Sequence, residues 1–210
     1  MQRDYARWAR HFWLAADEQI YCPPAARAPN AVPQLAFYSR TVTPRRAVEI
    51  GLLALEELAS RGVAFHANLF GSRLDIAEAP FAASDCGVLD PMDLAALYGR
   101  CDVGICFSTT NYSLIPQEMM ACGLPCVDLE GYSSESVFGQ DGPVELSAFS
   151  PSALADHIER LMDDETLWQR RSDAGRAFVE AHTWQAAALE VEQGLREALR
   201  LRERASSAAG

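Results

Sequence analysis

Short apolar runs alternate with helical segments along most of this 210-residue chain, and this alternation is the strongest constraint on its fold. Residues 35–39 have the character of a buried strand, and apolar residues recur at helical spacing over 47–59. Thr43 and Pro44 fit the start of that helix, because threonine favours the N-cap and proline the first turn. Strands separated by single helices need crossover connections, so the pattern predicts an α/β fold with a doubly wound parallel sheet.

The same alternation continues through the middle of the chain. Further strands are expected over residues 63–70, 103–107 and 123–127, and further helices over 90–98 and 116–122. No Asn-Gly hairpin signal interrupts this series. Three consecutive helical segments follow over residues 151–162, 165–181 and 184–204, and we expect these additional C-terminal helices to flank the sheet.

The first 33 residues differ from the rest. Aromatic and apolar side chains lie among charges in residues 1–21, at Trp8, Phe12, Trp13 and Ile20. We interpret this stretch as a helix with an aromatic face that needs a partner. Prolines then follow at positions 23, 24, 29 and 33, as in a linker. We therefore expect an N-terminal helix and linker over 1–33, one domain over 34–204, and a frayed tail over 205–210.

Charge and hydropathy restrict the partners. The formal charge of -11 at pH 7 and the pI near 4.8 argue against nucleic acid, because an acidic surface repels a phosphate backbone. A nucleotide is still compatible with this charge, since one diphosphate needs only two or three positive groups. No apolar run reaches the roughly 18 to 20 residues that span a bilayer, and the start lacks a signal-peptide pattern. Membrane association is expected to be peripheral at most.

The cysteines and histidines predict neither disulfides nor a metal site. The six cysteines form no CxxC pair and lie mostly in apolar segments, where a free thiol behaves as a small hydrophobe. Cys122 and Cys126 lack a matching second pair, and the four histidines are scattered. We expect a cytoplasmic protein, free or at the inner face of the membrane, that uses no metal and no cofactor.

The loops at the carboxyl ends of the strands are the candidate binding positions. Arg40, Arg45 and Arg46 lie beside the start of a helix whose free amides favour an anion, so they could bind a diphosphate or simply be solvated. Glu118 lies in the first turn of the helix that begins near Pro116. Its carboxylate could interact only with the helix dipole, or it could accept hydrogen bonds from the two hydroxyls of a ribose.

Several segments resemble the family-4 (formerly group 1) retaining glycosyltransferases. SLIPQEMMACGLPCV at 113–127 is similar to the "EAMAcGxPVV" segment of that family. GVLDPMDLAALY at 87–98 with CDVG at 101–104, and FVEAHTW at 178–184, are similar to two further blocks. FYSR at 37–40 and the 109–125 loop look closest to rhamnosyltransferase-like members that build bacterial surface polysaccharides. The likeness covers about residues 35–200 and implies the Rossmann-like C-terminal half of a GT-B fold.

The resemblance also implies roles for individual residues in binding a nucleotide-sugar donor. Glu118 would bind the ribose, while Gly87, Val88 and Leu89 would lie along the base. Arg40 and Arg45 would face the diphosphate and act in catalysis. Gly71 and Ser72 would allow close approach of the backbone, and the phosphate and sugar would be lined by Thr110, Asn111, Tyr112, Ser113 and Leu114. The chain departs from the family at Thr110, where the first of two glutamates usually stands, and in lacking a lysine near the first helix.

Retaining transfer in this family needs no metal, because positive groups and helix amides stabilise the departing nucleoside diphosphate. A GT-B enzyme has two domains with the active site between them, and this chain has room for only the second. We therefore expect a saccharide acceptor to bind a missing N-terminal domain, and the chain alone to bind donor without catalysis. The alternatives are a domain that binds another phosphorylated ligand and a non-catalytic interaction module. An oxidoreductase is disfavoured because no GxGxxG pattern follows Ser39.

Overall fold

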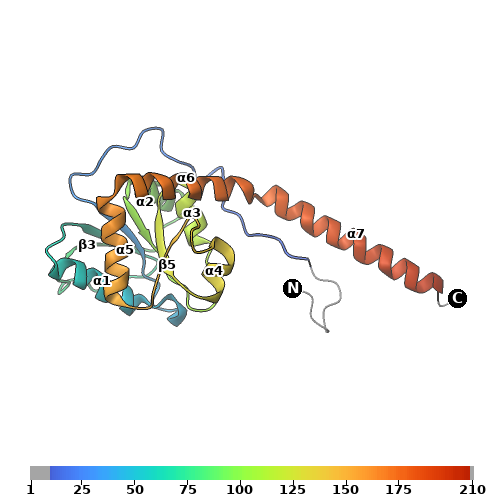
Figure 1. Cartoon of the computed structure of the whole chain (residues 1–210), viewed down its shortest axis with the longest axis horizontal. Coiled ribbons are helices and arrows are strands. Elements are labelled where there is room, and N and C mark those ends of the chain that lie inside the picture. Colours follow the sequence, from blue (N-terminus) through green and yellow to red (C-terminus); the bar gives the residue numbers. More distant parts are fainter. Residues whose placement is uncertain (1–9, 209–210) are drawn as a thin grey trace.

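A computed structural model describes residues 10–208 and shows one six-stranded parallel sheet (Figure 1). The strands are β1 Gln34–Tyr38, β2 His66–Phe70, β3 Ala82–Gly87, β4 Val103–Ile105, β5 Cys126–Leu129 and β6 Glu145–Ser147. Their order across the sheet is β3-β2-β1-β4-β5-β6, and every neighbouring pair is parallel. The predicted doubly wound fold is confirmed, and the strand order reverses its direction between β1 and β4.

Helices cover both faces of the sheet because successive strand residues point to opposite sides. They are α1 Val48–Ser60, α2 Pro91–Arg100, α3 Ile115–Ala121, α4 Tyr132–Phe138, α5 Pro151–Asp163, α6 Glu165–Ala181 and α7 Trp184–Ala208, with a 3-10 turn at Pro44–Arg46. Leu35 and Phe37 of β1 belong to the core cluster that contains α1 and α5. Ala36 and Tyr38 belong to the cluster that contains α2 and α3. Burial of both faces explains why the central strands are almost wholly apolar.

Three elements were missed by the sequence analysis. Strand β3 has the sequence AASDCG and is only partly buried, so it shows no apolar period. Strand β6 has only three residues and begins with a glutamate, and α4 contains three serines and a glutamate. Strands β3 and β6 are the two edges of the sheet, and α4 connects β5 to β6. At these edges the sequence has the weakest periodic pattern of apolar residues.

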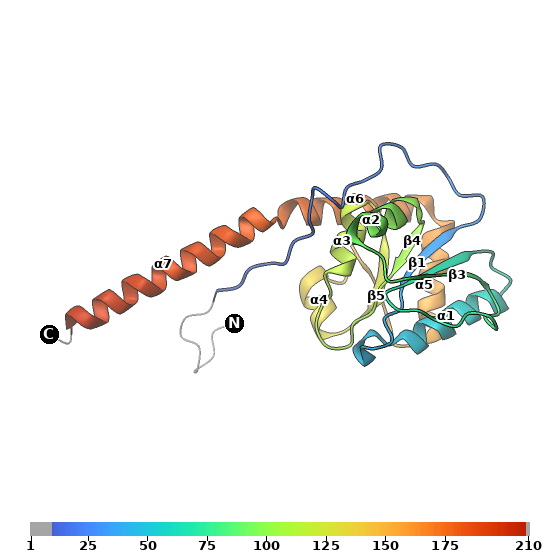
Figure 2. The same ribbon diagram turned by 180° about the vertical axis from the view of Figure 1, so that it is seen from behind.

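The C-terminal helices agree only in part with their predicted place. Helices α5 and α6 pack beside the sheet, and α5 contacts α1 directly. Helix α7 instead projects away from the sheet as a long rod (Figures 1 and 2). It continues to Ala208, so the predicted helix end at residue 204 is wrong, whereas the frayed tail stays a prediction and 209–210 lie outside the described residues. No helix in residues 10–208 is both long and apolar enough to cross a bilayer.

The predicted N-terminal helix is wrong in its described part, and residues 1–9 lie outside that part. Residues 10–21 run in irregular conformation except for a turn at 18–20. The Trp13 ring packs edge-on against His182 at a centroid distance of 4.9 Å and also contacts Phe178 and Tyr112. The Leu14 amide donates to the Tyr112 hydroxyl over 3.4 Å. Trp13 therefore packs on the domain from an irregular segment and not from a helix.

Asp102 fastens the proline-rich linker to the domain. Its carboxylate accepts hydrogen bonds from the Gln34 amide at 2.6 Å and from Asn30 Nδ2 at 2.8 Å, and it forms an ion pair with Arg27. The Arg27 guanidinium lies 3.9 Å from the centre of the Trp168 ring, whose Nε1 donates to the Asp102 carbonyl. These contacts hold the chain in the direction in which it enters β1.

A buried carboxylate joins β6 to the two helices that follow it. Glu145 is almost fully buried and accepts hydrogen bonds from His157 Nδ1 at 3.0 Å and Arg160 Nη2 at 2.9 Å, and from Arg171 Nε. Burial alone raises the pKa of Glu145, but the hydrogen bonds from His157 and Arg171 and the charges of the arginines outweigh it and lower the pKa to about 2. The ionised form therefore stabilises the fold.

Replacement of this carboxylate is expected to destabilise the domain. The Glu145→Gln variant should lose about 3 kcal/mol of unfolding free energy at pH 7 in urea denaturation, because Arg171 would keep its burial without its charged partner. The folded pKa lies below the ordinary value of 4.5, so the wild-type advantage is complete above that pH and disappears as the pH falls towards 2. The exposed Glu56 of α1, changed to Gln, is the matched control. An equal loss in both variants, or no loss in Glu145→Gln, would contradict the assigned network.

Candidate functional site

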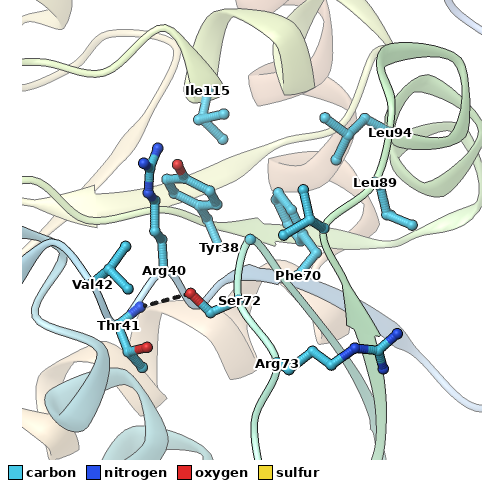
Figure 3. A pocket seen from close by; sticks show the side chains of 12 residues that line it. Tyr38, Arg40, Thr41, Val42, Phe70, Ser72, Arg73, Leu89, Leu94 and Ile115 are labelled. Atoms are coloured by element: carbon cyan, nitrogen blue, oxygen red, sulfur yellow. Dashed lines mark hydrogen bonds between the residues drawn. The ribbon is translucent and has the colours of Figure 1, made fainter.

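A cavity of about 580 Å³ lies at the carboxyl ends of β1, β2 and β3. Its lining comes from the strand ends, the loops after them, and one residue each from α2 and α3: Tyr38, Arg40, Thr41, Val42, Phe70, Gly71, Ser72, Arg73, Val88, Leu89, Leu94 and Ile115. Figure 3 shows the aromatic rings of Tyr38 and Phe70 beneath this space, with Leu89 and Leu94 at one side. The cavity thus has an apolar floor and polar loops at its rim.

Two glycines let the loop backbones meet at this edge. Gly71 has φ 102°, and a Cβ there would lie 2.6 Å from the Tyr38 ring, so this position tolerates no side chain. Its amide donates to the Gly87 carbonyl over 2.7 Å, and Gly87 has φ 63°. The ends of β2 and β3 are therefore joined directly below the cavity, where backbone can approach a ligand.

The rim carries positive charge although the chain as a whole is acidic. The Arg40 side chain extends beside the Tyr38 ring on the side of the cavity where Ile115 lies (Figure 3). Arg73 is 84% exposed and lies 3.6 Å from the Asp85 carboxylate. The Thr41 amide donates to Ser72 Oγ over 3.2 Å and ties the two loops together (Figure 3). The two guanidinium groups lie on opposite sides of the cavity (Figure 3), so an anion near Ile115 would meet Arg40 alone, while Arg73 pairs with Asp85.

Glu118 lies one helical turn after the lining residue Ile115, although it is not itself among the lining side chains. Its Oε2 atom is buried and has no hydrogen-bond partner among the described residues. Burial raises the pKa of Glu118 to about 7. The charge of Glu118 in turn contributes to raising the pKa of the buried Tyr98, behind desolvation of that ring, and Tyr98 packs on Phe70 at 5.6 Å. A buried carboxylate oxygen without a partner beside a cavity is the expected position of an acceptor for a ligand's hydroxyl groups.

The loop after β4 lies on the other side of the 3-10 turn. Arg45 donates to Asn111 Oδ1 and, over 3.5 Å, to Ser108 Oγ, and its carbonyl accepts from the Thr109 amide at 3.0 Å. Arg45 therefore fixes this loop. Neither Arg45 nor any of residues 110–114 is among the side chains that line the 580 Å³ cavity.

Two buried charged groups hold the base of that loop. One of them is Arg46, which was expected to bind a diphosphate or to be solvated and is instead buried against the domain. Asp128 accepts from the amides of Leu129 at 2.7 Å and Ser108 at 3.2 Å, and from Ser134 Oγ at 3.1 Å. Burial raises the pKa of Asp128 to about 6 despite these hydrogen bonds. Arg46 donates to the Phe107 carbonyl over 3.2 Å and lies 4.9 Å from the centre of the Tyr38 ring. These contacts keep β4 and β5 in register where the loop begins.

The structure thus divides the sequence-based candidates into three groups. Arg40, Gly71, Ser72, Val88 and Leu89 line one cavity, and Gly87 lies directly below it. Glu118 adjoins that cavity through α3. The remaining candidates lie elsewhere: Arg45 is in the 3-10 turn, and the loop after β4 that it contacts contains Thr110, Asn111, Tyr112, Ser113 and Leu114. Their roles stay predictions. The other lining residues were missed, and they are Tyr38, Thr41, Val42, Phe70, Arg73, Leu94 and Ile115. For Arg73, its position two residues after Gly71 was a usable signal.

Comparison with known proteins agrees with this architecture. Residues 33–159 match the family described as WsaF, C-terminal domain. The O-antigen biosynthesis protein RfbC of Myxococcus xanthus is 29% identical over 193 residues, which are 88% of this chain and 15% of RfbC. The chain therefore spans less than a sixth of that relative's length.

Solved structures share the fold at low sequence identity. A sucrose-phosphate synthase from Thermosynechococcus elongatus has a TM-score of 0.74 at 19% identity, over 89% of this chain and 52% of that one. HepE from Anabaena in complex with UDP-glucose has a TM-score of 0.69 at 16% identity, over 90% and 56%. The C-terminal domain of the group 1 glycosyl transferase LpcC from Francisella tularensis has a TM-score of 0.66 at 14% identity, over 80% and 97%. The fold is that of a GT-B glycosyltransferase C-terminal domain. The family match covers more than half of the 210 residues, and the chain therefore belongs to the WsaF C-terminal domain family.

Proposed function

We propose that the cavity binds the nucleoside diphosphate of a nucleotide-sugar donor, and that this domain transfers the sugar with retention when it is joined to an acceptor-binding N-terminal domain. The observation that carries the proposal is the combination of Arg40 in the cavity with the unpaired, buried oxygen of Glu118 beside it. One group matches a diphosphate and the other matches the hydroxyls of a ribose.

Within this proposal each region of the site takes one part of the nucleotide. The base lies along Gly87, Val88 and Leu89, and the ribose hydroxyls donate to Glu118 at the α3 side. The diphosphate meets Arg40, with the backbone at Gly71 and Ser72 close to it. The sugar then points towards the loop of Thr110 and Asn111, which Arg45 holds in place.

The relatives agree with a donor and an acceptor of these classes. HepE was solved with UDP-glucose, and RfbC is described as an O-antigen biosynthesis protein. For the present chain we accordingly propose a nucleotide-activated hexose or deoxyhexose as donor and a bacterial surface polysaccharide as acceptor. The six cysteines are free thiols, four of them buried, which fits a reaction in the reducing cytoplasm, free or at the inner face of the membrane.

The chemistry follows from charge stabilisation. The acceptor hydroxyl oxygen bonds to the anomeric carbon on the face from which the diphosphate departs. The electron pair of the broken carbon–oxygen bond stays on the diphosphate, whose oxygen takes up the proton that the hydroxyl releases. Arg40 lowers the energy of this developing charge in a partly desolvated cavity. Thr110 supplies no charge to the sugar, so the transfer relies on the leaving-group side, and no metal takes part in the proposed step.

Removal of the Arg40 guanidinium is expected to weaken nucleotide binding. Arg40→Ala should raise the Kd for UDP or dTDP by about 10- to 100-fold in calorimetry, since a charge-assisted hydrogen bond contributes roughly 1.5–3 kcal/mol. Arg170→Ala, an exposed change on α6, is the control and should leave the Kd unchanged. If Arg40→Ala and the wild type bound UDP with equal affinity, the proposed position of the diphosphate in this cavity would be wrong. Absence of any thermal shift with nucleoside diphosphates would favour the interaction module instead.

The ionised carboxylate of Glu118 is expected to lower the stability of the folded domain and to strengthen the binding of UDP. Its folded pKa of about 7 exceeds the ordinary 4.5, so wild-type stability is complete below pH 4.5 and falls as the pH rises through 7. Glu118→Gln should therefore melt at a higher temperature than wild type at pH 8 and at a similar temperature at pH 4. It should also bind UDP about tenfold more weakly at pH 8, with a smaller loss at pH 5.5, because only the carboxylate accepts from both hydroxyls. If Glu118→Gln were less stable than the wild type at pH 8 and bound UDP equally tightly, this role of Glu118 would be contradicted.

The 210-residue chain by itself is expected to bind donor without transferring the sugar. Isotope-labelled UDP-glucose incubated with the chain and an oligosaccharide acceptor should yield no labelled glycan. Addition of an acceptor-binding domain from the same polypeptide should restore transfer. Transfer by the chain alone would show that this domain contains a complete active site.

A further inference from the structure

A second cavity, of about 300 Å³, lies at the carboxyl ends of β4, β5 and β6. The residues that matter for its chemistry are Thr109, Thr110, Glu130, Gly131, Ser133 and Phe149. It shares no lining residue with the 580 Å³ cavity. The loop over 108–114 and the 3-10 turn of Pro44–Arg46 lie between the two, joined through the hydrogen bond from the Thr109 amide to the Arg45 carbonyl.

Phe149 gives this second cavity an aromatic wall. The side chain is 63% exposed, although it lies in a connection of only three residues between β6 and α5. Within this connection the Ser150 amide donates to the Ala148 carbonyl over 2.7 Å. The backbone that carries Phe149 is thus restrained between two regular elements, so binding at its exposed ring would order little further backbone.

Neutral hydrogen-bonding groups face the ring. Thr109 Oγ1 donates to the Arg45 carbonyl, Thr110 Oγ1 donates to Asn111 Oδ1, and Ser133 Oγ accepts from the Tyr112 amide. Each of these hydroxyl oxygens retains acceptor capacity for a ligand. The exposed Glu130 adds a carboxylate, and a Cβ built on Gly131 would meet no atom within 4 Å, so open space adjoins the backbone there.

The lining offers an anion no basic side chain. None of the lining residues within the described chain is basic, and Glu130 would repel a phosphate. A neutral polyol fits better. A pyranose ring presents an apolar face of C–H groups that packs on an aromatic ring, and its edge carries hydroxyls that donate to carboxylates and to serine or threonine oxygens.

We infer that this second cavity binds a pyranose unit of a glycan chain, independently of the nucleotide. The inference goes beyond the nucleotide site and holds whether or not Arg40 binds a diphosphate. Because the two cavities lie on opposite sides of the 108–114 loop, a glycan here would be positioned on the domain itself, next to the loop that faces the transferred sugar.

Saturation-transfer NMR of the 210-residue chain tests this inference. The probes are the methyl pyranosides of glucose, mannose and rhamnose at about 10 mM, close to saturation for a millimolar ligand. Ring protons of at least one probe should receive saturation in the absence of nucleotide. Phe149→Ala should weaken that binding by about threefold to tenfold, in keeping with the contribution of an aromatic contact. Phe12→Ala, which removes an aromatic ring of 48% exposure outside both cavities, should leave it unchanged.

Two further arms separate this site from the donor site. Arg40→Ala should bind UDP more weakly and keep the pyranoside signal. Phe149→Ala should keep its affinity for UDP and bind the pyranoside more weakly. Thus failure of nucleotide binding would leave this inference intact. No saturation of any of the three pyranosides, or equal binding by Phe149→Ala, would overturn it. Saturation of sugar protons only in UDP-glucose, with loss in Phe149→Ala, would also overturn it by identifying the cavity as part of the donor site.

Discussion

The parallel alignment of all six strands is the constraint on which the rest of the molecule depends. Because parallel strands are joined by crossovers, every connection leaves the sheet at the carboxyl edge and returns at the other. The loops after β1, β2 and β3 therefore gather Arg40, Gly71 and Leu89 around one cavity. The reversal of strand order between β1 and β4 separates this group from the loop after β4. Residues distant in the sequence become neighbours through topology alone.

Much of this arrangement can be predicted from the sequence, because the elements concerned are determined by residues close together in the chain. The strands at the centre of the sheet are apolar, and Asp90 caps α2 by accepting from the Asp93 amide at 3.0 Å, as its position before Pro91 predicts. The elements that escaped prediction are held by distant contacts. Strand β6 depends on ion pairs between Glu145 and arginines of α5 and α6, and such pairs leave no mark in a three-residue segment.

The same distinction applies to the site. Arg40 could be located because it follows the first strand, and the carboxyl-edge rule needs only the position of that strand. The contact of Arg45 with Asn111 could not be predicted, since it joins loops 66 residues apart. The buried oxygen of Glu118 is a tertiary property too, because it depends on how α3 packs against neighbouring elements. Sequence therefore located the candidates, while packing determined which of them share a cavity.

The position of Trp13 links the leading segment to the loop after β4. Its ring touches Tyr112 on that loop and His182 at the junction of α6 and α7, and the neighbouring Leu14 amide donates to the Tyr112 hydroxyl. Lifting the segment off the domain would expose the indole and break that hydrogen bond at the same time. The leading segment thus links two distant parts of the domain, because a change in its position would alter contacts at the loop after β4 and at the base of α7 together.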